Sequence, residues 1–245
     1  MKNFTSLIKE TFEIFKQKNA IWSILIVFLI GILISIVIYS ALFFGLIAAL
    51  AGAKTTQLLV SLLLMLIMLL LTGIWSLFIT LALMIYIIKP EKNKLKEIFK
   101  EAWNKLGQGL WIAILTIFFV GLASIFFIIP GIIVGLFLSL GTYILIVEDK
   151  KGMAALKRSW NLVKGGWWKF VGRILLLAVI VNTIFYVLNS IHGILVSIFQ
   201  FIFIPFNIVF MYLLYLELKK IAESRIPASE VQPKPMKIKE NKEGN

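Results

Sequence analysis

The sequence contains no cysteine and a single histidine, and charged residues make up only 15% of it. Without cysteine the chain has no disulfide, no thiol nucleophile and no cysteine-ligated metal site. It also lacks a GxxxxGK[ST] phosphate-binding loop and an HExxH zinc motif. Hydrophobic residues make up 60% of the chain, whereas a soluble domain has roughly half. The composition therefore predicts an integral membrane protein.

Long runs without charge predict the membrane-spanning helices, because a helix needs about 20 apolar residues to cross the hydrocarbon. Uncharged runs cover 20–53, 55–88, 108–147 and 174–216. The third run is interrupted by Pro130 and Gly131 and the fourth by "NSIHG", and both segments favour turns. The first run is too long for a signal peptide, so we expect it to be a retained span. The predicted fold class is all-α, with six transmembrane helices in three hairpins at about 20–50, 57–88, 109–129, 131–147, 168–189 and 194–216.

The charged residues predict the orientation in the membrane. All Lys and Arg residues except Lys54, and all Asp and Glu residues, fall before the first span, between hairpins or after the last span. The positive-inside rule then places both termini and both long loops in the cytoplasm, as in a prokaryotic plasma membrane. The net charge of +13 is explained by this topology, so we expect no nucleic-acid partner. The chain after residue 221 is basic and poor in apolar residues, which predicts a disordered tail over 222–245.

Each hairpin is preceded by a segment typical of an amphipathic interfacial helix. These entry helices are expected at about 3–18, 92–107 and 152–164. The second and third align without gaps, Trp103 with Trp160 and Trp111 with Trp168, and the N-terminal segment is a looser copy. The pattern indicates either an internal repeat or the features common to any cytoplasmic entry into a membrane helix.

The third entry segment, 148–168, carries the candidate site. Met153, Leu156, Trp160, Val163 and Trp167 are spaced as one stripe of a helix, which we expect to face the lipid. Gly165 and Gly166 then form a hinge into the next span, as Pro130 and Gly131 do earlier in the chain.

The candidate site residues support two interpretations. Glu148 ends the fourth span, where an acid opposes the helix dipole, and it either pairs with a nearby cation such as Arg158 or helps to form a lipid-headgroup or metal site. The full set of candidates for the structural pair or headgroup site is Glu148, Arg158, Ser159, Lys164, Trp160 and Trp168.

A longer pattern links these residues to a family. Its positions are Pro130-Gly131, Val147-Glu148, Ala155-Leu156, Arg158-Ser159, Leu162, Gly165 and Trp168. In this pattern the chain resembles the membrane domain fused to some glycerophosphoryl diester phosphodiesterases, and the stand-alone bacterial and archaeal relatives of that domain, whose function is unknown. The resemblance implies six membrane helices and no catalysis here, because the chemistry of the fused enzymes belongs to a separate soluble barrel.

A second candidate site is a polar cavity between the last two spans. Asn182, Thr183 and Tyr186 cluster on the fifth span, and Asn207 follows Pro205 on the sixth. These groups could line a cavity or could form hydrogen bonds between helices. The only histidine, His192, is expected in the turn between the two spans, across the membrane from every acid, so a Ser–His–Asp triad is excluded.

Three functions remain open at this point. The leading one is a non-catalytic membrane protein that binds anionic lipid through its entry helices and organises the bilayer. The others are a transporter or channel for a neutral or lipidic solute, and the membrane subunit of a separate catalytic chain. We expect membrane lipids as partners and no cofactor or metal; a homo-oligomer or a further protein partner stays open.

Overall fold

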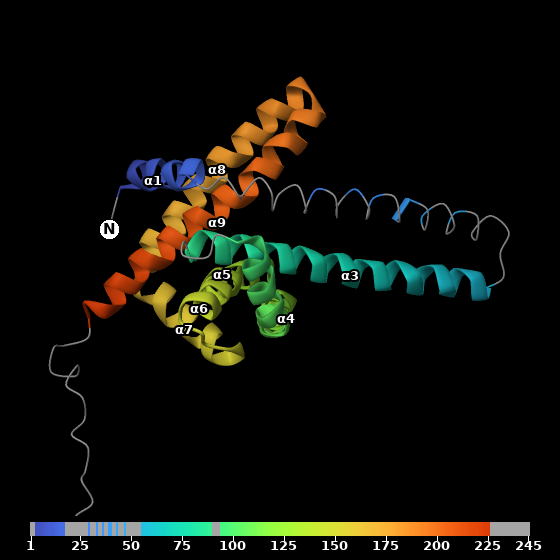
Figure 1. Cartoon of the computed structure of the whole chain (residues 1–245), viewed down its shortest axis with the longest axis horizontal. Coiled ribbons are helices and arrows are strands. Elements are labelled where there is room, and N and C mark those ends of the chain that lie inside the picture. Colours follow the sequence, from blue (N-terminus) through green and yellow to red (C-terminus); the bar gives the residue numbers. More distant parts are fainter. Residues whose placement is uncertain are drawn as a thin grey trace, which may run out of the picture.

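The computed structural model describes residues 3–17, 55–89 and 94–225, with isolated positions between the first two ranges: Leu29, Leu33, Ile36, Tyr39, Ser40, Phe43 and Ile47. Throughout this described part the regular secondary structure is helical (Figure 1). The helices are α1 (Phe4–Gln17), α3 (Thr55–Ile88), α4 (Leu95–Phe126), α5 (Ile128–Leu138), α6 (Gly141–Val147), α7 (Gly152–Gly165), α8 (Trp167–Ile191) and α9 (Gly193–Glu223).

Five stretches are long and apolar enough to cross a membrane: Leu59–Ile88, Leu95–Ile125, Ile128–Val147, Trp167–Ile191 and Ile198–Glu223. They match the second to sixth predicted spans in order. The first predicted span, 20–50, lies outside the described residues except at the isolated positions above, and most of the predicted tail, from 226 onward, lies outside them too. The described part of the chain is therefore all-helical, with the character of a multi-pass membrane protein.

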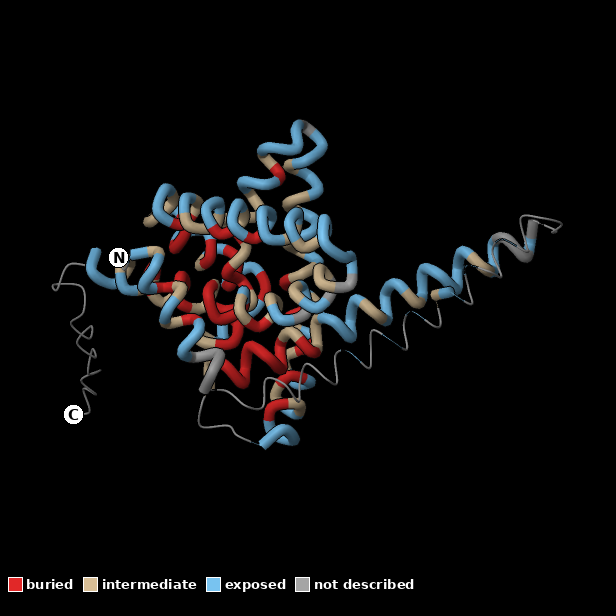
Figure 2. Tube along the Cα trace, turned by 90° about the horizontal axis from the view of Figure 1, so that it is seen from above, coloured by how far each residue is buried: buried red, intermediate tan, exposed pale blue. Residues whose placement is uncertain are grey.

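The core lies where the inner parts of several helices meet. Its buried side chains come from the C-terminal half of α3, the first half of α4, and from α6, α7 and the C-terminal half of α9. Figure 2 shows these buried residues as a central group surrounded by exposed helices. α1 joins the core from outside, where Leu7 is buried and Phe4 and Phe12 contact Phe210 and Phe206 of α9.

Apolar arms project from this core. Most apolar side chains between Leu59 and Trp75 of α3 are exposed, and Figure 1 shows α3 leaving the core in a direction different from that of the α8–α9 hairpin. Exposed apolar surface on this scale is typical of lipid-facing helices and not of soluble monomers. Because spanning helices tilt by roughly 0–40° from the bilayer normal, we expect the two arms to come closer to parallel when both cross one bilayer.

The structure corrects two predicted boundaries around the second hairpin. The predicted entry helix 92–107 and span 109–129 are one continuous helix, α4. Isolated glycines weaken a helix without necessarily ending it, and Gly109 is instead a packing position, where an added Cβ would lie 3.2 Å from Leu81.

The turn between α4 and α5 also differs from the prediction. It lies at Phe127, which is extended with φ −161° and ψ 152°, and Pro130 sits in the first turn of α5, where its missing amide hydrogen costs nothing. Gly131 allows close approach of the two helices, since a Cβ there would lie 1.9 Å from the Ser124 hydroxyl oxygen. Pro130 and Gly131 therefore pack the hairpin and do not form its turn.

The fourth predicted span, 131–147, is broken in its middle. α5 ends at Leu138, Ser139 and Leu140 form a turn, and α6 begins at Gly141. The break leaves backbone groups without helical partners, which is costly in an apolar environment. Ser159 of α7 meets this requirement: its hydroxyl donates to the Phe137 carbonyl at 2.6 Å and accepts from the Leu140 amide at 3.2 Å.

The hinge into α8 is formed by one of the two predicted glycines. α7 runs through Gly165, and Gly166 (φ −136°, ψ 26°) separates it from α8. A Cβ on Gly166 would lie 2.5 Å from Leu218 of α9. Gly166 thus lets the turn pack closely on α9, because a side chain there would displace the end of the Leu218 side chain. The Gly165 carbonyl accepts a hydrogen bond from Arg225 at 2.8 Å.

We predict that Ser159→Ala destabilises the fold by about 1–3 kcal/mol, because it leaves a buried carbonyl and a buried amide without partners. The matched control is Ser190→Ala, which removes an exposed hydroxyl that bonds only within α8, to the Tyr186 carbonyl. Thermal unfolding in the same detergent measures both variants. Equal melting temperatures for the two would show that Ser159 does not stabilise the break.

Candidate functional site

Glu148 is the centre of the candidate site and lies directly after α6. Its carboxylate accepts hydrogen bonds from Arg158 of α7 at 3.2 Å and from the Tyr215 hydroxyl of α9 at 2.9 Å, and it pairs with Lys150 at 3.0 Å. Only 11% of its side chain is exposed. One carboxylate therefore joins three helices, and we call these four residues the Glu148 cluster.

The partners of Glu148 keep it ionised. Burial alone raises the pKa of this carboxyl, but the hydrogen bonds from Lys150 and Tyr215 and the positive charge of Arg158 outweigh burial and hold the pKa below its ordinary value. The ionised form is thus favoured in the fold. Since three donors already surround this acid, the arrangement is that of a structural anchor.

The segment that connects α6 to α7 is a tight turn held from α4. Asp149 has φ 54°, a left-handed conformation that is uncommon outside glycine, and its carboxylate pairs with Lys105. Lys105 also donates to the Leu145 carbonyl at 3.2 Å. Gly152 follows with φ 49°, and a Cβ there would lie 2.9 Å from the Trp111 ring. The turn directs α7 back along α6, so that Arg158 reaches Glu148.

The remaining predicted residues divide into two groups. Ser159 is buried at the break between α5 and α6, and Trp160 stacks on Phe137 with ring centroids 4.1 Å apart. Trp167 stacks on Phe137 as well, at 4.5 Å. Lys164 is exposed, and Trp168 is 84% exposed. The structure therefore brings Glu148, Arg158, Ser159 and Trp160 together along α6 and leaves Lys164 and Trp168 outside.

The face that α7 buries differs from the predicted stripe. Its buried residues are Gly152, Ala155, Leu156, Ser159, Leu162 and Val163, whereas Met153 and Trp160 are 40% and 38% exposed. The small residues Ala155 and Ser159 let α7 approach α5 and α6 closely, so this face contacts protein and not lipid. The buried face is therefore rotated from the predicted stripe, because the small residues Ala155 and Ser159 lie against protein while the large Met153 and Trp160 stay partly exposed.

The contacts that the sequence analysis did not predict include Tyr215 with Glu148, Lys105 with Asp149, and Arg173 with Glu217. For the last pair a signal existed, because Arg173 and Glu217 directly flank the uncharged run 174–216. If that run forms a hairpin, its two ends must meet. The other two pairs depend on how α4, α6 and α9 pack, and no local pattern indicates them.

The predicted polar cavity is not formed by the described residues. Asn182, Thr183, Tyr186 and Asn207 are all exposed. Asn182 and Thr183 donate to carbonyls of their own helix, those of Ala178 and Val179. The nearby groove between α1, α8 and α9 is lined by the apolar neighbours of these residues. The Asn182 and Thr183 side chains are thus satisfied locally, as Thr and Asn often are in apolar helices.

Side chains that bind metal ions do not cluster in the described part of the chain. No group of three or more His, Asp or Glu residues there could hold a metal ion. His192 caps the end of α8, where its amide bonds to the Leu188 carbonyl at 3.0 Å. Comparison of the chain with family models, curated proteins and solved structures gives no match.

We predict that Glu148→Gln and Arg158→Gln each lower stability by about 1–3 kcal/mol. The double variant is expected to lose less than the sum, because the two side chains contact each other. Lys157→Gln, on the exposed face of α7, is the matched control and should change little. A double-mutant cycle on thermal unfolding measures the coupling; full additivity would show that the pair contributes nothing.

The same pair predicts a pH dependence. Because the pKa of Glu148 is lowered in the fold, its contribution is complete above the ordinary carboxyl pKa and is lost as the pH falls through the lowered value. The difference in stability between the wild type and Glu148→Gln should therefore shrink only under acidic conditions. A difference that is unchanged down to pH about 3 would contradict this assignment.

Proposed function

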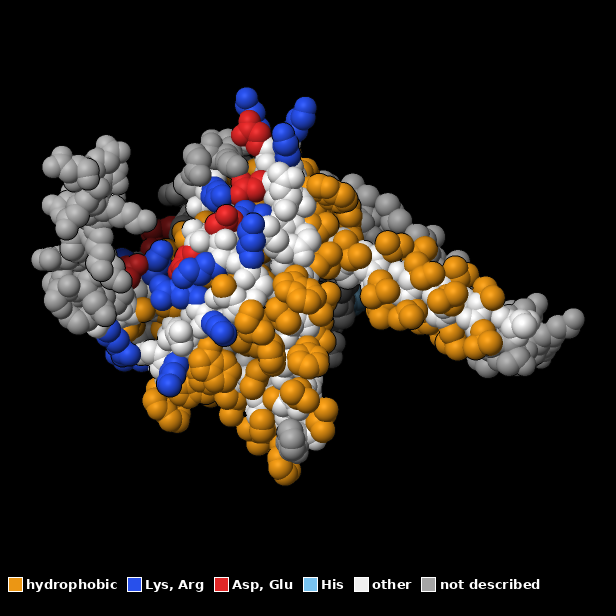
Figure 3. Space-filling view, turned by 90° about the horizontal axis from the view of Figure 1, so that it is seen from below, with side chains coloured by type: hydrophobic (Ala, Val, Ile, Leu, Met, Phe, Trp, Pro, Cys, Tyr) orange, Lys and Arg blue, Asp and Glu red, His pale blue; other side chains and the backbone are white. Residues whose placement is uncertain are grey.

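We propose that this chain is a non-catalytic, multi-pass membrane protein that binds anionic lipid with the basic residues at one side of its helices. The observation that carries the proposal is the separation of side chains in Figure 3: charged groups gather over the core, while the projecting helices are covered by apolar groups. A protein with this surface has one part that fits the hydrocarbon and one that fits a charged membrane surface.

The acids in this region are largely neutralised within the protein. Glu101, Glu148, Asp149 and Glu217 each pair with a Lys or Arg. Several lysines outside these pairs, in contrast, are exposed along α7 and its flanks, namely Lys151, Lys157, Lys164 and Lys169. The outward field is therefore positive, and each such residue near an anionic leaflet contributes about 1 kcal/mol to the attraction.

The proposal places this basic side in the cytoplasm of a prokaryotic cell, in keeping with the positive-inside rule. We also propose that the chain belongs to the group of membrane domains whose motif it resembles around residues 130–168. We further propose that the chain is not an enzyme. Two observations support this: the Glu148 carboxylate is already bound by donors of the protein, and His192 lies at a helix end. A transporter has less support, because the two grooves described in the structure are lined by apolar atoms.

We predict that the protein is more stable in nanodiscs that contain phosphatidylglycerol than in phosphatidylcholine alone, and that high salt reduces the difference. Replacing Lys157, Lys164 and Lys169 together by Gln should remove about 3 kcal/mol of the attraction and most of the stability difference. The same three residues replaced by Arg keep the charge and serve as the control. Equal stability of the wild type in both lipids, or an unchanged difference in the Gln variant, would refute the proposal.

A further inference from the structure

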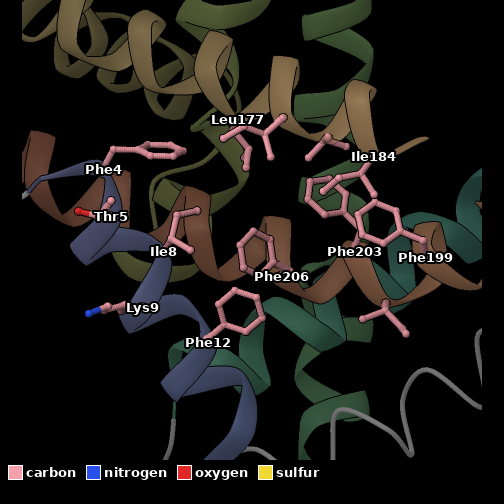
Figure 4. Close-up of a pocket in the computed structure, with 13 residues that line it drawn as sticks. Phe4, Thr5, Ile8, Lys9, Phe12, Leu177, Ile184, Phe199, Phe203 and Phe206 are labelled. Carbon is pink, nitrogen blue, oxygen red and sulfur yellow. The ribbon is translucent and has the colours of Figure 1, made fainter. Parts of the chain in front are cut away.

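A groove of about 500 Å³ lies between α1, α8 and α9 (Figure 4). We call it the α1 groove; residues that define it are Lys9 and Phe12 of α1, Val181 and Ile184 of α8, and Phe199 and Phe203 of α9. Its volume is in the range of ligand sites, roughly 300–1,000 Å³. All of its measured lining surface is apolar, so it fits a hydrocarbon and no polar solute.

Lys9 lies at the edge of the α1 groove. Figure 4 shows the phenyl rings of Phe12, Phe203 and Phe206 turned toward the groove, while the amine of Lys9 is directed away from them. Its side chain thus contributes methylenes to the lining and places the charge outside, as expected for a snorkelling lysine. Within the described residues Lys9 pairs with no carboxylate.

The position along the helices matches the depth of an acyl chain. The Arg173–Glu217 pair joins α8 to α9 where their uncharged part begins. The groove begins at Leu177, about one helical turn further along α8. An apolar space that starts just beneath a charged boundary is where the first carbons of a lipid tail lie in a bilayer.

The same arrangement occurs a second time in the molecule. Another groove, of about 430 Å³, lies between α4, α5 and α7 and is lined by Phe119, Leu138, Met153, Lys157 and Trp160. In both grooves one helix supplies a lysine and, three residues later, an aromatic side chain: Lys9 with Phe12 of α1, and Lys157 with Trp160 of α7. Each of the two grooves therefore combines an apolar lining with one lysine.

We propose that the α1 groove binds one acyl chain of an anionic phospholipid, with the lipid phosphate held by Lys9. The apolar lining selects the tail, and the lysine at its edge supplies the complementary charge for the headgroup. This inference rests on the membrane location in the proposed function but adds a discrete site to it. The bound lipid would join α1 to the α8–α9 hairpin.

The test is native mass spectrometry of the full chain in dodecyl maltoside with added phosphatidylglycerol or phosphatidylcholine. We expect phosphatidylglycerol to bind more tightly, and Ile184→Trp, which fills the groove, to weaken its binding at least tenfold. The control Val187→Trp adds the same bulk at an exposed position of α8 outside the groove. Lys9→Gln should weaken phosphatidylglycerol binding about fivefold, because one basic contact contributes about that factor. Phosphatidylcholine should be weakened less, because its choline cation offsets the phosphate charge, and Lys9→Arg should bind normally.

Each contrary outcome is informative. Undiminished phosphatidylglycerol binding in Ile184→Trp, or equal loss in Ile184→Trp and Val187→Trp, would overturn the site; Ile180→Trp, which also fills the groove, replaces the first variant if that one does not fold. If the protein binds neither lipid and Ile184→Trp lowers its stability, the groove is occupied by the chain itself and the lipid site is overturned. If nanodiscs that contain phosphatidylglycerol still stabilise the protein in any of these cases, the proposed lipid site in the α1 groove is wrong, but the proposed function is not affected.

Discussion

The fold depends on satisfying the backbone where the fourth span is broken between α5 and α6. In an apolar environment free carbonyl and amide groups are expensive, so the break can exist only with a partner nearby, and Ser159 of α7 is that partner. α7 is fixed a second time at the end of α6, where Arg158 and Tyr215 meet Glu148. Two polar contacts therefore place α7, and α7 in turn sets the position of α8 through the close packing of Gly166 on Leu218.

This anchoring separates the two faces of α7. The small and apolar residues face the protein, and the lysines at 157 and 164 stay exposed. Because the acids near the helix ends pair within the fold, the exposed surface keeps an excess of positive charge. In the proposed function, structural ion pairs and lipid attraction are therefore linked: the pairs that hold the helices together leave the lysines as the groups that would meet an anionic membrane.

Much of the architecture could be predicted from the sequence. Long uncharged runs indicate segments that face an apolar environment, and Gly or Pro residues indicate where helices can end. The helices α1 and α7, the five spans among the described residues and the hinge at Gly166 follow from such local signals. The Ser139–Leu140 break was not predicted, since the segment 131–147 carries no charge and the group that compensates the break lies on another helix. The merged α4 and the turn at Phe127 were missed because a glycine or proline can serve packing as well as turns.

The central claim is that the charged side of the chain faces the cytoplasm while the helical hairpins cross the membrane. Single cysteines at Lys54, His192 and Lys96 test it cleanly, because the natural chain contains no cysteine. In intact cells an impermeant maleimide should label the variants at 54 and 192, and it should label the variant at 96 only after permeabilisation. Labelling of position 96 in intact cells with positions 54 and 192 protected would contradict the orientation and, with it, the account of lipid binding.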